Sequence, residues 1–228
     1  FSLKRGELLT SFDFDQAIHA MRFSPCGRYL AAVADSGLTK IFSVDGEDVA
    51  LLYDFSIQKD CAWLSFSPCG NFLAISADEG VLVVTNIEAQ QLVYLSGHTE
   101  TTDFVFFSRT SPNSIISIAM KERGLKMWIA DNSLWGRCVN FSTRCSTNMK
   151  NRLVSCCWNA DDTRIVAISQ NYLYTWDSCT RKNVSIINHQ VFTEHCTTCV
   201  ANPVMPNIVF VGTQSGMGSV WDIETKKL

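Results

Sequence analysis

Cysteine and histidine side chains gather late in the sequence, at a spacing that could bind a metal. His195-Cys196-Thr197-Thr198-Cys199 contains a Cys-x-x-Cys pair, and His189 is close by. A structural zinc normally takes four ligands from two spaced pairs, and no second Cys-x-x-Cys occurs. Because neighbouring side chains on a strand point to opposite faces, we expect the adjacent pair Cys156-Cys157 to diverge. The two cysteines of the Cys-x-x-Cys, three apart on a strand, should diverge too. The sequence therefore predicts no metal site.

Catalytic motifs of other kinds are missing. A nucleophilic serine or cysteine needs a base within hydrogen-bond reach, and no Gly-x-Ser-x-Gly motif is present. The glycine-rich run 212–218 does not open a helix, as a phosphate-binding loop would, and it matches a hairpin turn. Asp161-Asp162 also falls in a turn, where we expect both carboxylates to be solvated. The prediction is a protein that is not an enzyme, with no catalytic residue and no cofactor.

Composition narrows the classes of partner. The net charge is −3 and no stretch concentrates Lys and Arg, which argues against direct nucleic-acid binding through phosphates. No apolar run reaches the ~18 residues of a membrane helix, and no signal peptide is visible, so we expect neither membrane insertion nor secretion. The ten cysteines are expected to be buried free thiols in a reducing compartment.

A tryptophan-like position recurs along the chain and sets the arrangement of these residues. It closes a short apolar strand six times, at steps of 41, 43, 43, 48 and 45 residues: Phe1, Phe42, Thr85, Trp128, Trp176 and Trp221. A second marker keeps the same period, since Phe23-Ser24-Pro25-Cys26-Gly27 returns as Phe66-Ser67-Pro68-Cys69-Gly70. Pro and Gly favour a tight turn there. Each unit thus reads as strand, turn, strand, turn, strand.

A period of about 40–45 residues that ends in Trp-Asp is the signature of WD40 repeats, each of which supplies four strands to a propeller blade. We predict an all-β WD40 β-propeller with about five blades over residues 1–228. The predicted repeat units are 1–42, 43–85, 86–128, 129–176 and 177–221. The first and the last residues of the sequence fall at the same place in the repeat. Either the chain is part of a larger, seven- or eight-bladed propeller, or its N-terminal outer strand completes the last blade and closes a small ring.

Well-formed WD repeats hold a buried hydrogen-bond chain of His, Ser or Thr, Asp and Trp, because buried polar groups must be paired. Only one Gly-His pair occurs, at Gly97-His98, and its blade supplies Trp128. The turn position of that blade holds Glu122 in place of Asp. We expect His98 to be a structural link and the blades to be held mainly by apolar packing. The predicted structural residues are His98, Trp128, Trp176, Trp221 and Asp222.

The longest insertion spans about residues 131–152, in the 48-residue step. Loops that differ between repeats are common binding places, and Trp and Arg are enriched among interface hot spots. The predicted partner-binding residues are Trp135, Arg137 and Arg144. The alternative for Trp135 is that it packs as an outer-strand residue.

Residues 61–228 also resemble one WD-repeat family, the bromodomain and WD-repeat-containing proteins (the pleckstrin-homology-domain-interacting protein family). The segments that carry the resemblance are residues 61–67, 70–74, 98–99, 107–108, 124–128, 153–158, 161–166, 171–176 and 202–210. Departures from the family pattern are Lys121-Glu122-Arg123-Gly124 and Gln214-Ser215-Gly216 at its Gly-Asp turns. The Trp-Asp-x-Arg motif of many cullin-4 receptors is absent.

The resemblance implies the later part of an eight-bladed propeller in a nuclear, chromatin-associated transcription regulator with effects on cell shape. It also implies chromatin or histone partners and substrate reception for a cullin-4 ubiquitin ligase. The alternative is a WD40 scaffold of another complex, in ribosome biogenesis or trafficking, with a cytoplasmic location. In either case the expected partners are other proteins.

Overall fold

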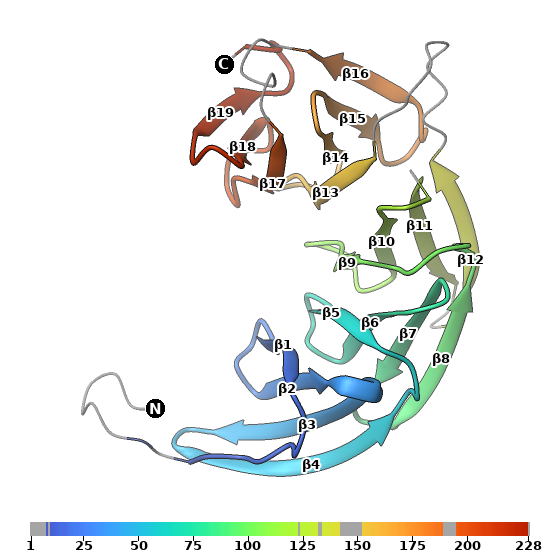
Figure 1. Cartoon of the computed structure of the whole chain (residues 1–228), viewed down its shortest axis with the longest axis vertical. Coiled ribbons are helices and arrows are strands. Elements are labelled where there is room, and N and C mark those ends of the chain that lie inside the picture. Colours follow the sequence, from blue (N-terminus) through green and yellow to red (C-terminus); the bar gives the residue numbers. More distant parts are fainter. Residues whose placement is uncertain are drawn as a thin grey trace.

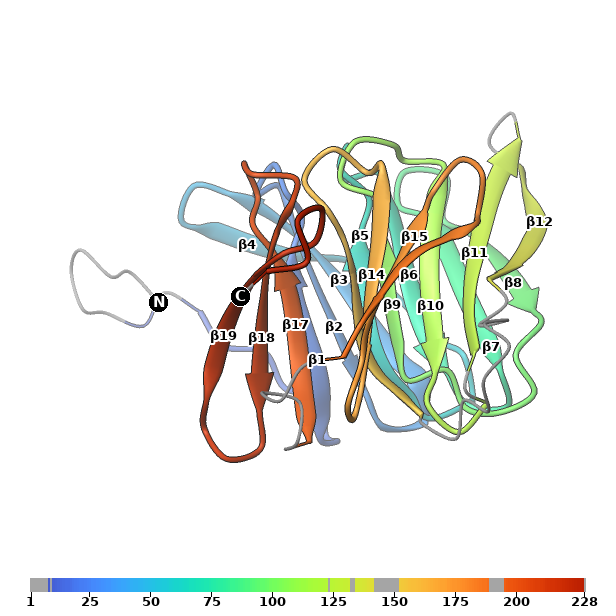
Figure 2. The same ribbon diagram turned by 90° about the horizontal axis from the view of Figure 1, so that it is seen from above.

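The fold is taken from a computed structural model, which describes residues 8, 10–122, 124–131, 134–141, 152–188 and 195–227. These residues form five antiparallel sheets, each built from strands consecutive in sequence. The sheets follow one another around an arc that does not close, with the first strand of each sheet innermost (Figure 1). In the view from above, the strands stand side by side and their turns collect at two ends (Figure 2). No helix in the described ranges is long and apolar enough to cross a membrane.

The strand bounds repeat a common pattern of inner, middle and outer strands. The first sheet contains β1 (Ile18–Phe23), β2 (Tyr29–Ala34), β3 (Leu38–Asp45) and β4 (Asp48–Ser56), with the short 3-10 helix η1 (Asp35–Gly37) between β2 and β3. The second contains β5 (Cys61–Phe66), β6 (Phe72–Ala77), β7 (Val81–Asn86) and β8 (Gln91–Ser96). The third contains β9 (Phe104–Phe107), β10 (Ser114–Ala119), β11 (Gly124–Asp131) and β12 (Leu134–Phe141). The fourth contains β13 (Leu153–Trp158), β14 (Arg164–Ser169), β15 (Leu173–Asp177) and β16 (Asn183–Ile187). The last contains β17 (Cys196–Ala201), β18 (Ile208–Thr213) and β19 (Gly218–Asp222).

The boundaries of the predicted repeat units do not coincide with the boundaries of the sheets. Unit 43–85, for example, contains the outer strand β4 of one sheet and then β5, β6 and nearly all of β7 of the next. The hairpin turn predicted for residues 212–218 is present between β18 and β19, where the Gly216 amide donates to the Thr213 carbonyl at 3.2 Å.

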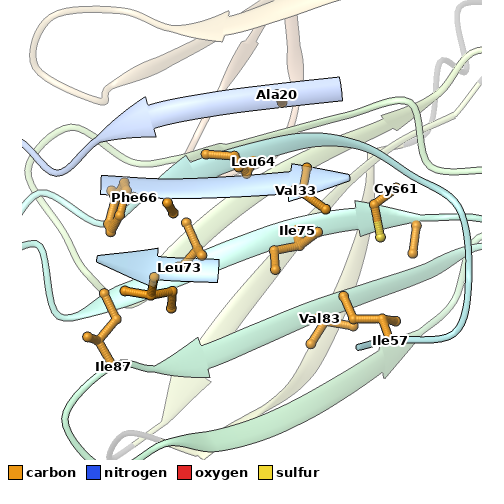
Figure 3. Packing of buried hydrophobic residues seen from close by; sticks show 13 residues of the cluster. Ala20, Val33, Ile57, Cys61, Leu64, Phe66, Leu73, Ile75, Val83 and Ile87 are labelled. Atoms are coloured by element: carbon orange, nitrogen blue, oxygen red, sulfur yellow. The ribbon is translucent and has the colours of Figure 1, made fainter. Parts of the chain in front are cut away.

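Apolar layers between neighbouring sheets form the core. The cluster between the first and second sheets joins Val33 and Ile41 to Leu64, Leu73 and Ile75, all of them at most 1% exposed (Figure 3). Similar clusters lie at each of the next three junctions. A middle strand is therefore apolar on both faces, because each face meets a different neighbour.

The last sheet leaves one apolar face uncovered. Its row of cross-strand partners is 54%, 42% and 45% exposed: Val200, Phe210 and Val220. The matching row of the fourth sheet faces the last sheet and is at most 8% exposed: Cys157, Val166 and Thr175. The exposed row thus has the chemistry of a blade-to-blade junction.

We expect the purified 228-residue chain to self-associate through this row, because a contiguous exposed apolar patch favours association. Phe210→Asp should shift it toward the monomer in sedimentation velocity at concentrations where the parent chain associates. Val204→Asp is the matched control, since Val204 is 81% exposed and lies outside the row. Equal association of both variants and the parent would contradict the expectation.

At the other end of the arc, the N-terminal segment lies on the first sheet. The Phe12 and Phe42 rings are 4.2 Å apart between centroids, and Phe14 is 5% exposed beside Phe42. A groove of about 560 Å³ runs between this segment and the sheet. The arc is open, so the alternative of a small closed ring is wrong for this structure. Residues 10–14 contact the first sheet, and most of residues 1–9 lie outside the described residues.

Candidate interaction surface and its supporting network

The third sheet contains a chain of hydrogen bonds centred on Ser117. Trp128 Nε1 donates to Ser117 Oγ at 2.8 Å, and Ser117 Oγ lies 2.7 Å from His98 Nε2. His98 Nδ1 lies 2.7 Å from Glu122 Oε2. The backbone of His98 packs closely against Gly80 of the second sheet. Glycine is needed there, because a Cβ on residue 80 would lie 2.0 Å from the His98 carbonyl oxygen. The structure thus brings together His98 and Trp128, with Glu122 at the place of the usual Asp.

One protonation pattern satisfies every member of this chain. Ser117 Oγ accepts a hydrogen bond from the Trp128 indole, so its own hydroxyl donates to His98 Nε2, and His98 Nδ1–H donates to Glu122. The imidazole is then neutral. Burial lowers the pKa of His98, and this effect exceeds the opposing influence of Glu122.

Stability should fall in mild acid because of His98. A folded-state pKa below the usual ~6.5 means that the stabilisation is complete above about pH 6.5 and is lost as the pH falls below it. His98→Gln removes the titrating group, so the excess stability of the parent over this variant should shrink by up to ~1.4 kcal/mol per pH unit below that point. Urea titrations at several pH values measure this difference, and a constant difference would contradict the assignment.

Glu122 is held by a second set of donors. Lys126, 8% exposed, forms an ion pair with Glu122 Oε1 at 3.0 Å and also donates to the Gly97 carbonyl. The Thr99 amide donates to Glu122 Oε2 at 3.1 Å. Burial opposes ionisation of Glu122, but the hydrogen bonds from Lys126 and His98 bring its pKa below the usual value. Glu122, with its longer side chain, therefore forms the hydrogen bond to His98 that an Asp was expected to form.

The other predicted structural residues lie in the fourth and last sheets. Trp176 and Trp221 are fully buried, and Trp221 Nε1 donates to Ser219 Oγ at 2.8 Å. Asp222 accepts from two backbone amides of its turn, at 2.9 and 3.0 Å. These bonds, from Thr225 first, lower the pKa of Asp222. The Asp of this Trp-Asp pair therefore caps the turn after its strand.

Asp162 differs from the solvated carboxylate that the sequence predicted. It reaches the loop after β9, where Ser108 Oγ, the Thr110 amide and Thr110 Oγ1 donate to it at 2.6–2.7 Å. The Arg109 amide adds a bond at 3.1 Å. Local spacing places Asp162 in a turn, but only the neighbouring sheet supplies these donors.

The two cysteines of the Cys-x-x-Cys also depart from expectation. A register shift between Cys196 and Thr198 resets the alternation of β17, so Cys196 and Cys199 are both buried in the layer against the fourth sheet. Cys156 and Cys157 do face different layers. Cys199 Sγ lies 3.9 Å from Cys157 Sγ, and hydrogen bonding to Cys157 together with burial raises its pKa well above the usual value. Within the described residues, no group of three or more potential metal ligands occurs.

The insertion at residues 131–152 is only partly a loop. Residues 134–141 form β12, which pairs with β11 at the outer edge of the third sheet. Trp135 and Arg137 are opposite Ala130 and Ile129 in this pairing, so both lie on an outer strand. Arg144 lies outside the described residues. β11 ends at Asp131, and β12 begins at Leu134 directly opposite it in the pairing.

A group of four residues that the sequence did not indicate lies on the inner strands β1, β5 and β9. The Arg22 guanidinium lies 4.4 Å from the centroid of the Trp63 ring. Trp63 meets Phe104 edge-on at 5.2 Å and Phe106 at 6.0 Å. Arg22 is exposed and the three rings are half-buried. We call these residues the inner aromatic group; alternation along each strand was the only local signal for it.

Comparisons with known proteins place the fold. No family model and no curated protein matches the sequence. The chain matches a structure of the mitotic checkpoint complex with a TM-score of 0.73 and 15% identity, covering 94% of this chain and 66% of that one. This chain folds as an open arc of β-propeller blades. It also matches the β-propeller domain of Cps50 (Swd1) from Myceliophteria thermophila, with a TM-score of 0.75 and 13% identity, covering 93% of this chain and 68% of that one.

The propeller arc thus spans about two thirds of the length of the chains it matches. Identities of 13% and 15% show the fold alone. Neither neighbour is described as a bromodomain protein, so the resemblance to that family has no support from these structures.

Proposed function

We propose that this WD40 arc is a non-catalytic scaffold that binds other proteins, with the inner aromatic group as one contact surface. The observation that supports the proposal is the stacking of Arg22 on Trp63 beside two phenylalanine rings, on three successive inner strands. Trp and Arg are the residue types that most often dominate the binding energy of an interface. A half-buried ring is already held in place, so little side-chain entropy is lost on binding.

The hydrogen bonds that several described polar side chains form within the fold also support a scaffold. His98 and Glu122 bond within one blade, Asp162 joins two blades, and Asp177 and Asp222 cap turns. Each of these side chains forms a hydrogen bond within the fold, and that bond would have to break before the side chain could act on a substrate. Function in such a fold depends on the surface that the blades present.

For the partners, the proposal follows the resemblance in residues 61–228: a nuclear, chromatin-associated complex, in which the protein receives substrates for a cullin-4 ubiquitin ligase. A scaffold in ribosome biogenesis or trafficking is the second candidate. The first predicts co-purification with histones or the cullin-4 adaptor, and the second predicts ribosomal or vesicle-coat proteins.

Quantitative proximity labelling in cells, with the full-length protein, tests the contact surface. Arg22→Ala should reduce labelling of the specific partners about tenfold, as expected for the loss of ~1.4 kcal/mol of binding energy. Lys182→Ala, at an exposed cation between β15 and β16, is the control. An unchanged partner set for Arg22→Ala would reject the inner aromatic group as a contact surface, and a set without any reproducible protein would reject the scaffold.

The outer strand β12 and the residues after it are a second proposed contact surface, which rests on Trp135, Arg137 and Arg144. Deleting residues 131–152 would remove a strand paired with β11, so the sharper experiment uses Trp135→Ala, Arg137→Ala and Arg144→Ala separately. Loss of a partner with retained melting temperature supports this surface. Retention of every partner in all three variants rejects it.

A further inference from the structure

Two turns of the same sequence, Ser-Pro-Cys-Gly, lie next to each other on the first and second blades. They connect β1 to β2 and β5 to β6. In each turn the serine hydroxyl accepts from the first amide of the following strand at 3.0 Å. Gly27 and Gly70 adopt φ values of 75° and 79°, a conformation that favours glycine. The two cysteines between Pro and Gly, Cys26 and Cys69, are therefore held in equivalent and well-defined places.

The Cys26 thiol rests against the neighbouring turn. Its Sγ lies 3.2 Å from the place where a Cβ on Gly70 would stand, so it contacts the residue that directly follows Cys69. Both thiols are free and exposed. Each is also in contact with the serine of its own turn: Cys26 Sγ lies 3.4 Å from Ser24 Oγ, and Cys69 Sγ lies 3.3 Å from Ser67 Oγ.

The surroundings of Cys26 favour its thiolate. Hydrogen bonds from Ser24 and then from the Arg28 guanidinium lower the pKa of Cys26 to about 7. Buried cysteines show the opposite effect, since burial raises the pKa of Cys61 to about 12 and that of Cys196 to about 11. Cys26 therefore combines exposure with a lowered pKa, which are the two conditions for a reactive cysteine.

We propose that Cys26 is a site of oxidation by hydroperoxides and that Cys69 is its resolving thiol, so that the product is a disulfide between the first and second blades. The Cys26 thiolate attacks one peroxide oxygen, the O–O bond breaks, and the sulfur becomes a sulfenic acid, while the other oxygen takes a proton from the solvent and leaves as water or an alcohol. The Cys69 sulfur then attacks the Cys26 sulfur and displaces hydroxide, which leaves as water with the Cys69 proton. Two electrons pass from the two thiols to one peroxide.

The size of the rate advantage follows from the thiolate fraction. Near pH 7 about 1% of a thiol with a pKa of ~9 is ionised, compared with about half of a thiol with a pKa of ~7, because one pKa unit changes the ionisation constant tenfold. The more acidic thiolate is intrinsically less nucleophilic, with a Brønsted slope of about 0.4–0.5. The net expectation is that Cys26 reacts about five- to eightfold faster than a thiol of ordinary pKa.

Alkylation by iodoacetamide, followed by peptide mass spectrometry across a pH series, tests the reactive thiol in the unmodified protein. Cys26 should react faster than the exposed thiol of Cys179 near pH 7, and its own reaction should have a midpoint near that pH. Arg28→Ala should move the midpoint upward, and unfolding in guanidinium should abolish the preference. Equal rates for Cys26 and Cys179 in the folded protein would overturn the site.

Hydrogen peroxide with dimedone as a trap tests the second thiol. In the parent protein the expected product is a peptide pair linked through Cys26 and Cys69, reversible by dithiothreitol. In Cys69→Ser the dimedone adduct should accumulate on Cys26, whereas in Cys179→Ser the disulfide should form as in the parent. An adduct on Cys26 with Cys69 still reduced in the parent would overturn the resolving role.

Discussion

Replacing Ser117 by alanine is expected to lower the free energy of unfolding by about 2–6 kcal/mol. Ser117 Oγ accepts a hydrogen bond from the indole N–H of Trp128 and donates one to His98 Nε2, and both partners are buried. The substitution leaves a donor and an acceptor without a partner, and each such group costs about 1–3 kcal/mol. Urea unfolding followed by tryptophan fluorescence measures the change.

Ser114→Ala is the control for that prediction. Ser114 begins the same strand, β10, and is half-buried, so the substitution tests the loss of a hydroxyl outside the chain of hydrogen bonds. We expect a change within about 0.5 kcal/mol. Similar losses for Ser114→Ala and Ser117→Ala would show that the chain contributes nothing beyond strand propensity.

Replacing Ile75 by alanine is expected to lower the free energy of unfolding by about 2–5 kcal/mol, the range for a large aliphatic side chain removed from a core. Ile75 is completely buried in the layer between the first two blades. The cavity would weaken the junction as well as the blade, because the layer belongs to both sheets. Hydrogen exchange should therefore show faster exchange in strands β2 and β6 than elsewhere.

Ile18→Ala makes the same change on an exposed strand position. Ile18 is 42% exposed on β1, so little packing is lost and we expect a change of about 0.5 kcal/mol or less. Comparable destabilisation at the two positions would mean that the layer between the blades is not the main source of stability.

These two predictions concern different means of holding a blade. One described blade has the complete chain from Trp128 through Ser117 and His98 to Glu122, whereas apolar layers occur at every junction between neighbouring sheets. The apolar layers therefore hold neighbouring blades together along the whole arc, and the chain of hydrogen bonds adds to the stability of the middle blade. The proposed scaffold function would need this rigidity, since the proposed contact residues come from separate blades.

Much of the fold follows from the sequence. The repeat of strands and turns at about 43-residue steps predicts the sheets, because strand length, turn chemistry and apolar alternation are local properties that short segments encode. The partnership of His98, Glu122 and Trp128 could be predicted in the same way, since each residue occupies a set place in its repeat. The predicted hairpin at residues 212–218 rests on local glycine positions.

Other features depend on contacts between residues that belong to different blades. The bonds of Asp162 to the Ser108 loop, the approach of Cys26 to Gly70 and the stacking of Arg22 on Trp63 join residues about 40–55 apart in sequence. A register shift in β17 turned Cys196 toward the same layer as Cys199, although strict alternation predicts opposite faces. Sequence periodicity alone determined that the chain forms propeller blades. Only their tertiary packing decided which side chains meet between blades and which face stays exposed, because those contacts depend on how each sheet is placed against the next.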